Sequence, residues 1–520
     1  MKLAAIDIGT NSIHMIVVNV LQKRNFEVIE RVKEMAKLGV GVFSNNRLSD
    51  RAYQVGLDTI ERYVQLADQL GVDDIITVAT SATREAENGE SFLNEVIRRT
   101  KIEPRIISGK EEARLIFLAA RNAIALEEKE NALVIDIGGG STEVVVGNRT
   151  NTLFGTSVKL GVIRLLDMFE NKDNIIGEDA RRVLESHIRF LAKDAIAQAK
   201  KVGFTRVIGT SGTNRTLGEA AYIERHNTEL QSVNAEVVQL KDLEELTEKL
   251  VKIDASKREK IDGISSRRSD AIHLGGILLT QLLKLAGVQE MTLCDASLRE
   301  GMILDYIDHH GKGITDFHVQ GDLRHRKAAQ LVQKYGSDWE SNCHIANLAL
   351  QLFEQTRSLH RFGTLEKDVL EYAALLHDIG QHLSFKSYHK SSRYILKRAD
   401  PRGFTDEEMV LMGQVIRYHR KARPKKKHGQ FRRLSKQQQR TVWILAGLLR
   451  IAVNLNRTKD QQIETLACDI SNEEIKIFAS GQGNLDVGIW AAMGDRHILG
   501  RALERNIAIA GDKQTDTLAN

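Results

Sequence analysis

A nearly identical stretch occurs twice in this chain. Residues 3–18 read LAAIDIGTNSIHMIVV, and residues 133–146 read LVIDIGGGSTEVVV. In both, Ile-Asp-Ile-Gly ends an apolar run, and a serine and a second apolar run follow, which is the pattern of a β-hairpin. The two copies lie 129 positions apart, in a region where strand-like and helical segments alternate. This repeat predicts two similar α/β domains in tandem.

The segments that follow each hairpin divide the chain into four predicted parts. Strand-like and helical runs alternate through residues 1–128 and again through residues 129–308, which are the two expected α/β domains. Helical periodicity then dominates residues 309–460, and residues 461–520 alternate weakly, as in a small α/β domain. Because 520 residues are too many for one hydrophobic core, several domains are expected.

The composition indicates the cellular compartment and the type of partner that we expect for this chain. Its net charge is +5, a mild basic excess that favours polyanionic partners. The three cysteines, Cys294, Cys343 and Cys468, are widely separated, which indicates neither a disulfide framework nor a zinc site. We therefore expect a reducing, cytoplasmic location. No uncharged apolar run is long enough to cross a membrane, so no membrane span is expected.

The two hairpin turns are predicted to bind phosphate, because glycine lets a ligand approach closely and the N–H groups of a turn point into one concavity. The candidate phosphate-binding residues are Gly9, Thr10, Asn11 and Ser12 in the first turn and Gly138, Gly139, Gly140, Ser141 and Thr142 in the second. Asp7 and Asp136 precede these turns and suit a hydrated Mg²⁺, which prefers oxygen ligands. The alternative is two ordinary strand-to-turn junctions with solvated carboxylates.

A third candidate loop, GTSGTNRT at residues 209–216, lies between a strand and a helix. Backbone donors and a helix N-terminus together suit an anion, so Ser211, Gly212 and Thr213 are predicted to bind phosphate. Thr213 or Asn214 is also a possible N-cap of the helix. In ATSATREA, Arg84 is predicted to clamp phosphate with two N–H groups, with Ser81 in support.

Five motifs, in order, resemble one enzyme family. AIDIGTNSIHM, ATSATREA, IISGKEEARLIF, VIDIGGGSTE and LREGM, spread over the first 302 residues, resemble the exopolyphosphatase and guanosine pentaphosphate phosphohydrolase (Ppx/GppA) family. More broadly, the glycine turns resemble those of actin, sugar kinases, acetate kinase and the heat-shock chaperone ATPases. The resemblance implies two ribonuclease H-like domains, followed by an all-α HD-like domain and a small α/β tail, as in long-form members.

The resemblance also bears on catalysis, since hydrolysis of a phosphoanhydride needs a group that orients the attacking water. In SGKEEARLIF, Ser108 and Glu111 have the spacing of a capping box, which leaves Glu112 to point elsewhere. The family also favours the second glutamate as the base, and it implicates Glu143 in catalysis, so both are predicted to be catalytic. Glu143 is a third candidate ligand of Mg²⁺. The alternative for Glu111 and Glu112 is that both are solvated.

Other charged residues match the family in part. Lys159 in SVKLGVIR, and Arg267 and Arg268 in ISSRRSDA, match basic positions of the family's substrate cleft and are predicted to bind phosphate. As isolated residues they would as often be surface charges. His14 matches the family pattern NSxHM, but a histidine in a hairpin is equally often structural.

The helical part resembles a metal-dependent HD phosphohydrolase in four residues, which are His344, His377, Asp378 and His389. Val453 stands where the late-helix aspartate of such a site is expected, so we expect no metal there. In long-form relatives this part supports dimerisation and extends a polyanion channel, which implies a homodimer through the C-terminal domains. Eight Lys and Arg at residues 420–433 fit such a channel. A solvated loop or incidental RNA binding is the alternative.

The resemblance thus implies a Mg²⁺-dependent exopolyphosphatase that releases orthophosphate from the end of inorganic polyphosphate. Removal of the 5′ γ-phosphate of pppGpp, which yields ppGpp, is the nearest alternative, and the basic run favours polyphosphate. A nucleotide- or alarmone-binding sensor without turnover is a third possibility. Nucleic acid is not an expected partner, because no aromatic residues are interleaved with the basic run.

Overall fold

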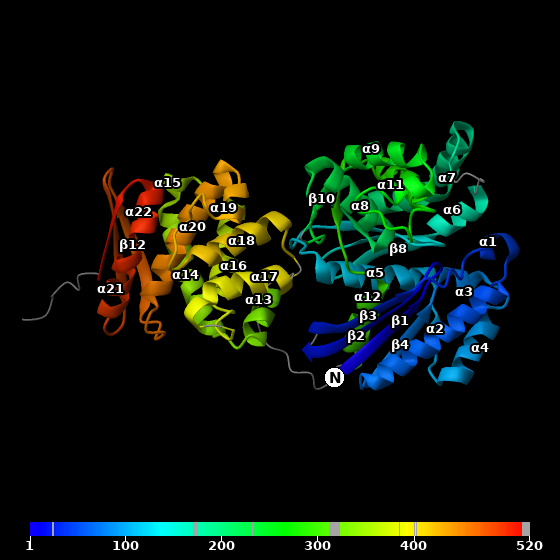
Figure 1. The fold of residues 1–520 in the computed structure, drawn as a ribbon, viewed down its shortest axis with the longest axis horizontal. Coiled ribbons are helices and arrows are strands. Elements are labelled where there is room, and N and C mark those ends of the chain that lie inside the picture. The colour runs from blue at the N-terminus through cyan, green and yellow to red at the C-terminus, as the bar shows by residue number, and fades with distance from the viewer. Residues whose placement is uncertain are drawn as a thin grey trace, which may run out of the picture. The chain divides into compact units, whose positions relative to one another are not determined.

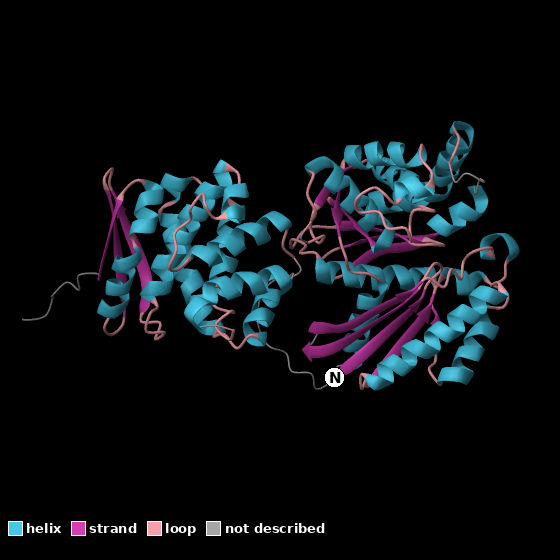
Figure 2. Cartoon of the chain, in the orientation of Figure 1, coloured by secondary structure: helices cyan, strands magenta, loops and turns pink. Residues whose placement is uncertain are grey.

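The structure is a computed structural model, and it describes residues 1–22, 25–169, 175–230, 232–310, 323–383, 385–399, 401 and 403–511. The described residues form two compact units, which are residues 1–310 and residues 323–511 (Figure 1). Both units contain helices and a sheet or sheets, so the chain has a mixed α/β fold (Figure 2). Among the helices described, none is both long and apolar enough to cross a membrane. The predicted tail is described as far as residue 511.

The first unit contains two lobes, each built on one sheet. The sheet of the first lobe has the strand order β3-β2-β1-β4-β5. Its strands are β1 (Lys2–Ile8), β2 (Ile13–Gln22), β3 (Asn25–Glu34), β4 (Asp74–Ala79) and β5 (Arg105–Ile106). Strands β1, β2 and β3 form an antiparallel meander, and β4 and β5 extend the sheet in parallel with β1. The first predicted hairpin is therefore present as β1–β2.

The sheet of the second lobe repeats this arrangement. Its strands are β6 (Ala132–Ile137), β7 (Thr142–Gly147), β8 (Thr152–Val158), β9 (Arg206–Thr210), β10 (Val237–Gln239) and β11 (Glu290–Leu293). Read from β8, the order is β8-β7-β6-β9-β11-β10. Strands β6, β7 and β8 are antiparallel, β9 is parallel to β6, and β11 is parallel to β9. Apart from the added edge strand β10, the two lobes share one topology, as the repeated hairpin predicts.

Helices cover the faces of both sheets. They are α1 (Val42–Asn45), α2 (Asp50–Gln69), α3 (Ser81–Glu85), α4 (Gly89–Thr100), α5 (Gly109–Ala123), α6 (Val162–Phe169), α7 (Glu178–Val202), α8 (Ser211–His226), α9 (Leu240–Val251), α10 (Ala255–Arg258), α11 (Ile272–Ala286) and α12 (Leu298–His310). Helices α2 and α4 pack on the outer face of the first sheet, and α7, α8, α9 and α11 on that of the second. Helices α5 and α12 lie between the sheets (Figure 1).

The start of α8 differs from the predicted one. The helix begins at Ser211, directly after strand β9, and its N-cap is Thr210. The prediction that Thr213 or Asn214 caps this helix was therefore wrong. Ser211 has a φ of 72°, in the left-handed region, so the chain turns sharply at this residue and leaves no room for a longer loop. The helix consequently starts at the point where the strand ends.

The start of α5 agrees with the prediction in one of two features. Ser108 is the N-cap, and its Oγ accepts a hydrogen bond from the backbone N–H of Glu111 at 3.2 Å. The Glu111 carboxylate does not return to Ser108, because Arg114 donates two hydrogen bonds of 2.8 Å to it. The predicted capping box is therefore half formed. Glu112, one position later, is buried, as expected for a side chain on the next helix face.

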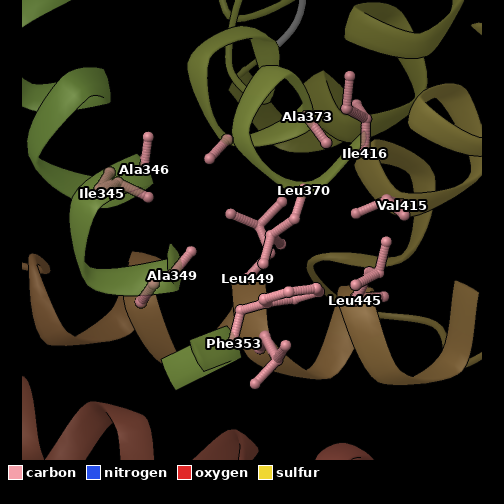
Figure 3. Close-up of a cluster of buried hydrophobic side chains, with 14 of the residues drawn as sticks. Ile345, Ala346, Ala349, Phe353, Leu370, Ala373, Val415, Ile416, Leu445 and Leu449 are labelled. Carbon is pink, nitrogen blue, oxygen red and sulfur yellow. The ribbon is translucent and has the colours of Figure 1, made fainter. Parts of the chain in front are cut away.

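The second unit has one apolar core that helices and a small sheet share. Its helices are α13 (Leu323–Lys334), α14 (Trp339–Gln355), α15 (Arg357–His360), α16 (Thr364–Leu376), α17 (Tyr388–Ala399), α18 (Asp406–Tyr418), α19 (Gly429–Arg433), α20 (Lys436–Leu455), α21 (Asp486–Asp495) and α22 (His497–Leu503). The sheet has the order β12-β13-β14, with β12 (Ile463–Ile470), β13 (Glu474–Gly481) and β14 (Asn506–Gly511). Figure 3 shows Phe353, Leu370 and Leu449 within this core, to which the sheet residue Ile475 also belongs.

Candidate active site

A cavity of about 330 Å³ lies between the two lobes of the first unit. Most of the predicted site residues line it. These are Asp7, Gly9, Thr10, Asn11, Ser12, Glu112, Asp136, Gly138, Gly139, Gly140, Ser141, Glu143, Ser211, Gly212, Thr213 and Arg268. The topology explains why they meet, because β1 and β6 are inner strands of their sheets and both lead into turns that line this cavity.

The two hairpin turns have the same backbone conformation. In the first turn the N–H of Gly9 donates to the carbonyl of Ser12 at 3.2 Å, and in the second the N–H of Gly138 donates to that of Ser141 at 2.9 Å. A Cβ at Gly9 would lie 2.8 Å from the Ser12 carbonyl oxygen, and one at Gly138 would lie 3.1 Å from that of Ser141. The tightness of each turn thus favours glycine, more strongly at Gly9 than at Gly138.

The turns also pack against one another across the lobes. A Cβ added at Gly139 would lie 3.0 Å from Cβ of Thr10, and one at Gly140 would lie 2.9 Å from Thr10 Oγ1 and 2.6 Å from Ser81 Oγ. A side chain at Gly139 or Gly140 would therefore require Thr10 and Ser81 of the first lobe to move. The close approach brings the backbone donors of both turns to one side of the same cavity.

Four predicted carboxylates line the cavity, and so does Asp295, which was not a predicted site residue. Asp7 and Asp136 lie near the ends of β1 and β6, Glu143 lies on β7 opposite Asp136, and Glu112 lies in the first turn of α5. Asp136, Glu112 and Glu143 are only 5%, 7% and 1% exposed. Buried carboxylates this close are unusual unless a cation or a proton compensates them.

Burial raises the pKa of each of the four predicted carboxyl groups. It raises that of Asp7 to about 6, although the Arg299 guanidinium acts in the opposite direction. The pKa of Asp136 is raised to about 7 by burial, against a hydrogen bond from Ser211. Glu112 is raised to about 8 by burial, against the Arg84 charge, and Asp7 and Asp136 add repulsion. Burial, Glu112 and Asp136 raise the pKa of Glu143 well above its ordinary value.

Three of the four carboxylates have identified hydrogen-bond partners, since Ser211 donates to Asp136. Arg84 Nη1 donates to Glu112 Oε2 at 3.3 Å and to the carbonyl oxygen of Ile107 at 2.6 Å. Ser157 Oγ donates to Glu143 Oε1 at 2.7 Å. Asp7 Oδ1, by contrast, is buried and has no hydrogen-bond partner among the described residues. Arg84 therefore orients Glu112, while Asp7 keeps an unsatisfied oxygen at the cavity.

Five cations line the same cavity, and only one of them was among the predicted site residues. They are Arg31, Lys33, Arg215, Arg268 and Arg299. Burial lowers the pKa of Lys33 to about 8, and the nearby arginines contribute further. Burial also lowers the pKa of Arg268 to about 10, with Arg215 adding repulsion. Cations packed this closely are destabilised by one another, and a bound polyanion would relieve the repulsion.

Sequence reasoning missed four of these cations because they come from elements far apart in the chain. Lys33 and Arg31 lie on β3, Arg215 on α8 and Arg299 on α12. A signal existed for Arg299, since it is the one basic residue of the LREGM motif, which is part of the family resemblance. For Lys33 no such signal exists, because the alternation of side chains along a strand does not show which lysine lines a cavity.

Five of the predicted phosphate-binding residues do not line the cavity. They are Ser81, Arg84, Thr142, Lys159 and Arg267. Ser81 Oγ donates to Glu85 Oε1 at 3.0 Å, and Thr142 Oγ1 donates to the carbonyl of Leu160 at 2.7 Å, so both hydroxyl groups already have acceptors. The side chain of Lys159 is 73% exposed and pairs with Glu85. Arg267 lines two neighbouring cavities instead, of about 50 and 370 Å³.

The third loop supplies the edge of the cavity near the cations. Ser211, Gly212 and Thr213 line it at the start of α8. A Cβ at Gly212 would lie 1.8 Å from Nη2 of Arg268, so the guanidinium rests directly on this glycine. The N-terminus of α8 and Arg268 consequently face the same part of the cavity, and both favour an anion.

The second unit gathers histidines instead of carboxylates. His377 and His389 are buried, and the ring of His377 lies 5.1 Å from that of His419, which was not a predicted residue. Asn342 Nδ2 donates to Asp378 Oδ1 at 2.7 Å. Burial lowers the pKa of His389 to about 4.

The remaining predicted residues of the second unit lie on helices or in the basic loop. His344 is on α14, and Val453, which is half-buried, is on α20. The basic run at 420–433 forms the segment before α19 and α19 itself, where most of its Lys and Arg side chains are exposed. Within the described parts of both units, no three His, Cys, Asp or Glu side chains form a group that could hold a metal ion by themselves.

Comparisons with known proteins cover both units. The family model of the Ppx/GppA phosphatase family matches residues 16–310, and the model of domain III of Ppx/GppA phosphatase matches residues 323–484. The crystal structure of an exopolyphosphatase from Cytophaga hutchinsonii is 27% identical, with a TM-score of 0.55, over 59% of this chain and 98% of that one. The PPX-GPPA enzyme of Aquifex aeolicus is 25% identical, with a TM-score of 0.50, over 59% and 99%.

Proposed function

Since this chain belongs to the Ppx/GppA phosphatase family, we propose that it is an exopolyphosphatase. It would hydrolyse the terminal phosphoanhydride bond of inorganic polyphosphate and release orthophosphate. The observation that carries this proposal is one cavity lined both by five carboxylates, four of them among the predicted site residues, and by five cations. A phosphate chain needs repeated cations along its length, whereas hydrolysis of its terminal bond needs a base and a metal site. Similarity to the Cytophaga exopolyphosphatase supports the same choice.

The carboxylates fit a divalent cation. Asp7 Oδ1 is buried without a partner among the described residues, and burial together with mutual repulsion raises the pKa values of the neighbouring carboxyl groups. We assign Asp7, Asp136 and Glu143 to Mg²⁺. Because no three such side chains among the described residues are placed to hold an ion by themselves, the ion would keep several waters and be held partly through them. When bound, Mg²⁺ would supply positive charge to the oxygens of the reacting phosphoryl group.

Glu112 is the proposed base. Its carboxylate lies in the cavity, Arg84 holds one of its oxygens, and its raised pKa of about 8 suits the acceptance of a proton from water near neutral pH. Glu111, on the neighbouring helix face, is paired with Arg114 and does not line the cavity. The two adjacent glutamates therefore have different roles, and Glu111 is a matched control for Glu112.

The turns and the cations would bind successive phosphates. The backbone N–H groups and hydroxyl groups of the two turns line the same cavity as the carboxylates and suit the terminal phosphate, together with Ser211, Gly212 and Thr213. Lys33, Arg215, Arg268 and Arg299 suit the phosphates behind it. Arg267 lines the neighbouring cavity of about 370 Å³ with Lys33 and would contact a more distant part of the chain.

Hydrolysis of pppGpp is the second candidate, and one observation favours it. The small cavity beside Arg267 and Arg268 is lined partly by Val162, Ile163 and Leu166, an apolar surface that suits a nucleoside better than a phosphate chain. The small volume of this cavity, about 50 Å³, keeps polyphosphate as the first choice. A nucleotide- or alarmone-binding sensor without turnover would bind the same ligands and release no phosphate.

The resemblance extends the proposal to the rest of the chain. The two lobes would be ribonuclease H-like domains, and the helices of the second unit an HD-like domain that supports a homodimer. The basic run at 420–433 would bind polyphosphate, since repeated cations suit a repeated anion. The cytoplasm is the proposed location.

The test is phosphate release from long polyphosphate and from pppGpp in parallel, with Mg²⁺ or a chelator. Wild type is compared with Glu112→Gln and with the control Glu111→Gln. Loss of a positioned base costs about 10²–10⁴ in rate, so Glu112→Gln should fall by this factor and Glu111→Gln should stay close to wild type. Binding without release by the wild type would identify a sensor. Full activity of Glu112→Gln would disprove the assignment of the base.

A further inference from the structure

A chain of three side chains joins the cations of the cavity to the first turn. Arg299 Nη1 is hydrogen-bonded to His14 Nδ1, and His14 Nε2 is hydrogen-bonded to Ser12 Oγ at 2.7 Å. Arg299 is itself held by Ser297, whose Oγ accepts from its Nη2 at 2.8 Å. Both ring nitrogens of His14 are thus occupied. Ser12, the last residue of this hydrogen-bonded series, lines the cavity.

The direction of each bond follows from what the groups can donate. A guanidinium group is only a donor, so His14 Nδ1 must accept from Arg299. The one ring hydrogen of a neutral imidazole is then on Nε2, which donates to Ser12 Oγ. Because that bond uses the Ser12 oxygen as an acceptor, the hydroxyl hydrogen of Ser12 is left for another partner. No second partner of this hydroxyl is present among the described residues.

The cations around His14 favour the same arrangement of its ring hydrogen. Arg299 donates to Nδ1, and Lys33 and Arg268 are also close enough to act on the ring. Protonation would place a hydrogen on Nδ1, against Arg299. The tautomer with hydrogen on Nε2 is consequently the one that the surrounding cations permit.

We propose that His14 is a positioning residue, which fixes Ser12 as a hydrogen-bond donor to a phosphoryl oxygen of the substrate; the inference rests on the proposed function. With the opposite tautomer, Ser12 would donate to the ring and would present only lone pairs to the anion. Arg299, at the other end of this hydrogen-bonded series, offers a second hydrogen-bond donor. Its Nε is buried and has no partner among the described residues. An anion beside Ser12 and Arg299 would satisfy both.

A double-mutant cycle tests whether His14 acts through Ser12. His14→Phe keeps the ring and removes both bonds, and Ser12→Ala removes the hydroxyl group. Each single variant is expected to lower kcat/KM for phosphate release by about 10- to 100-fold, the size of one hydrogen bond to a charged group. In the double variant the two losses should not multiply, because the second change removes an interaction that is already absent. Losses that multiply would overturn the proposal.

A conservative variant and a spectroscopic measurement distinguish positioning from a merely structural role. His14→Gln can accept from Arg299 and donate to Ser12, so it should recover most of the activity that His14→Phe loses. Nitrogen-15 NMR of labelled histidine, with His14→Gln to identify the signal, should show hydrogen on Nε2. Hydrogen on Nδ1 would refute the inference. The NMR measurement uses the wild-type protein and so decides even if His14→Phe fails to fold.

The outcomes also separate this inference from the proposed function. A wild type that releases phosphate from neither polyphosphate nor pppGpp would disprove the function. An active wild type with multiplying losses in the cycle would disprove only the role of His14.

Discussion

The two hairpin turns occupy equivalent places in the two lobes, yet they differ at one decisive position. Across the first hairpin Asp7 lies opposite His14, and across the second Asp136 lies opposite Glu143. The backbone hydrogen bond of the turn is the same in both copies. The surroundings differ, since His14 is close to cations and Glu143 is close to other carboxylates.

The comparison teaches how one local structure can serve two purposes. Burial favours the neutral form of both residues, and it lowers the pKa of His14 while raising that of Glu143. In our proposal both copies supply a metal-binding aspartate and backbone donors to phosphate. They differ at the position opposite that aspartate, where His14 supports a hydrogen-bond donor and Glu143 adds a carboxylate for the cation. Two copies of one turn would thus complete a single site.

The largest expected difference in activity is between two variants in which His14 or Glu143 is replaced by glutamine. Glu143→Gln should lower kcat by about 10²–10⁴, because it removes a charged oxygen from the proposed catalytic group. His14→Gln keeps hydrogen-bonding groups and should retain most of the activity. The measurement is phosphate release at saturating substrate and Mg²⁺. Equal losses in the two variants would contradict the division of roles between the copies.

A smaller effect is expected from loosening the second turn. Arg164 Nε donates to the carbonyl of Gly140 at 2.8 Å, and its Nη2 pairs with Glu85 Oε1 of the first lobe at 2.6 Å. Arg164→Ala should cost about 1–3 kcal/mol of unfolding free energy and about tenfold in kcat/KM, because the lobes lose a partly buried contact. Lys159→Ala is the control, since this exposed side chain pairs with the same glutamate and should cost less than about 1 kcal/mol.

Denaturant titrations and phosphate release measure these effects. If Lys159→Ala proved as damaging as Arg164→Ala, the second turn would not depend on Arg164. A large rise in KM for Lys159→Ala alone would instead restore the predicted phosphate-binding role of that lysine.

The smallest effect is the pH dependence of stability without metal. Raised pKa values mean that the folded carboxyl groups bind protons more tightly than the unfolded ones do, so their contribution is present at low pH and is lost as pH rises through about 6 to 8. In a chelator, Tm should fall by about 2–4 °C or more between about pH 5 and pH 8. His14, whose pKa is lowered, acts in the opposite direction and only below about pH 6.5.

Calorimetry with and without Mg²⁺ measures this dependence. Mg²⁺ should raise Tm more at the higher pH, because it competes with protons for the carboxylates. Glu112→Gln should flatten the profile in chelator, and Glu111→Gln should leave it unchanged. A Tm that rises with pH in the wild type would show that the carboxyl groups are not neutralised by burial.

Several features were accessible to sequence reasoning because they depend on neighbouring residues. The two hairpins follow from apolar runs around glycine turns, and the similar lobes follow from their repetition. The distinction between Glu111 and Glu112 follows from helix geometry, even though Arg114 replaces the return bond of the predicted box. The N-cap of α8 was predicted wrongly because the chain turns at Ser211 with an unusual φ.

Other features depend on contacts between distant segments. Lys33 and Arg299 meet at the cavity because β3 extends the first meander and α12 returns from the second lobe to pack on the first. In the second unit, the rings of His377 and His419 come together from the ends of α16 and α18. No spacing in the sequence encodes either meeting.

The sequence by itself determined the repeated turns, their glycines and the carboxylate beside each, because hairpin geometry and side-chain alternation act over a few residues. Only the tertiary structure decided which charges surround each turn, and therefore which of His14 and Glu143 faces cations and which faces carboxylates. The physical reason is that burial and electrostatic repulsion depend on distance in space, and packing brings together residues that the chain separates by hundreds of positions.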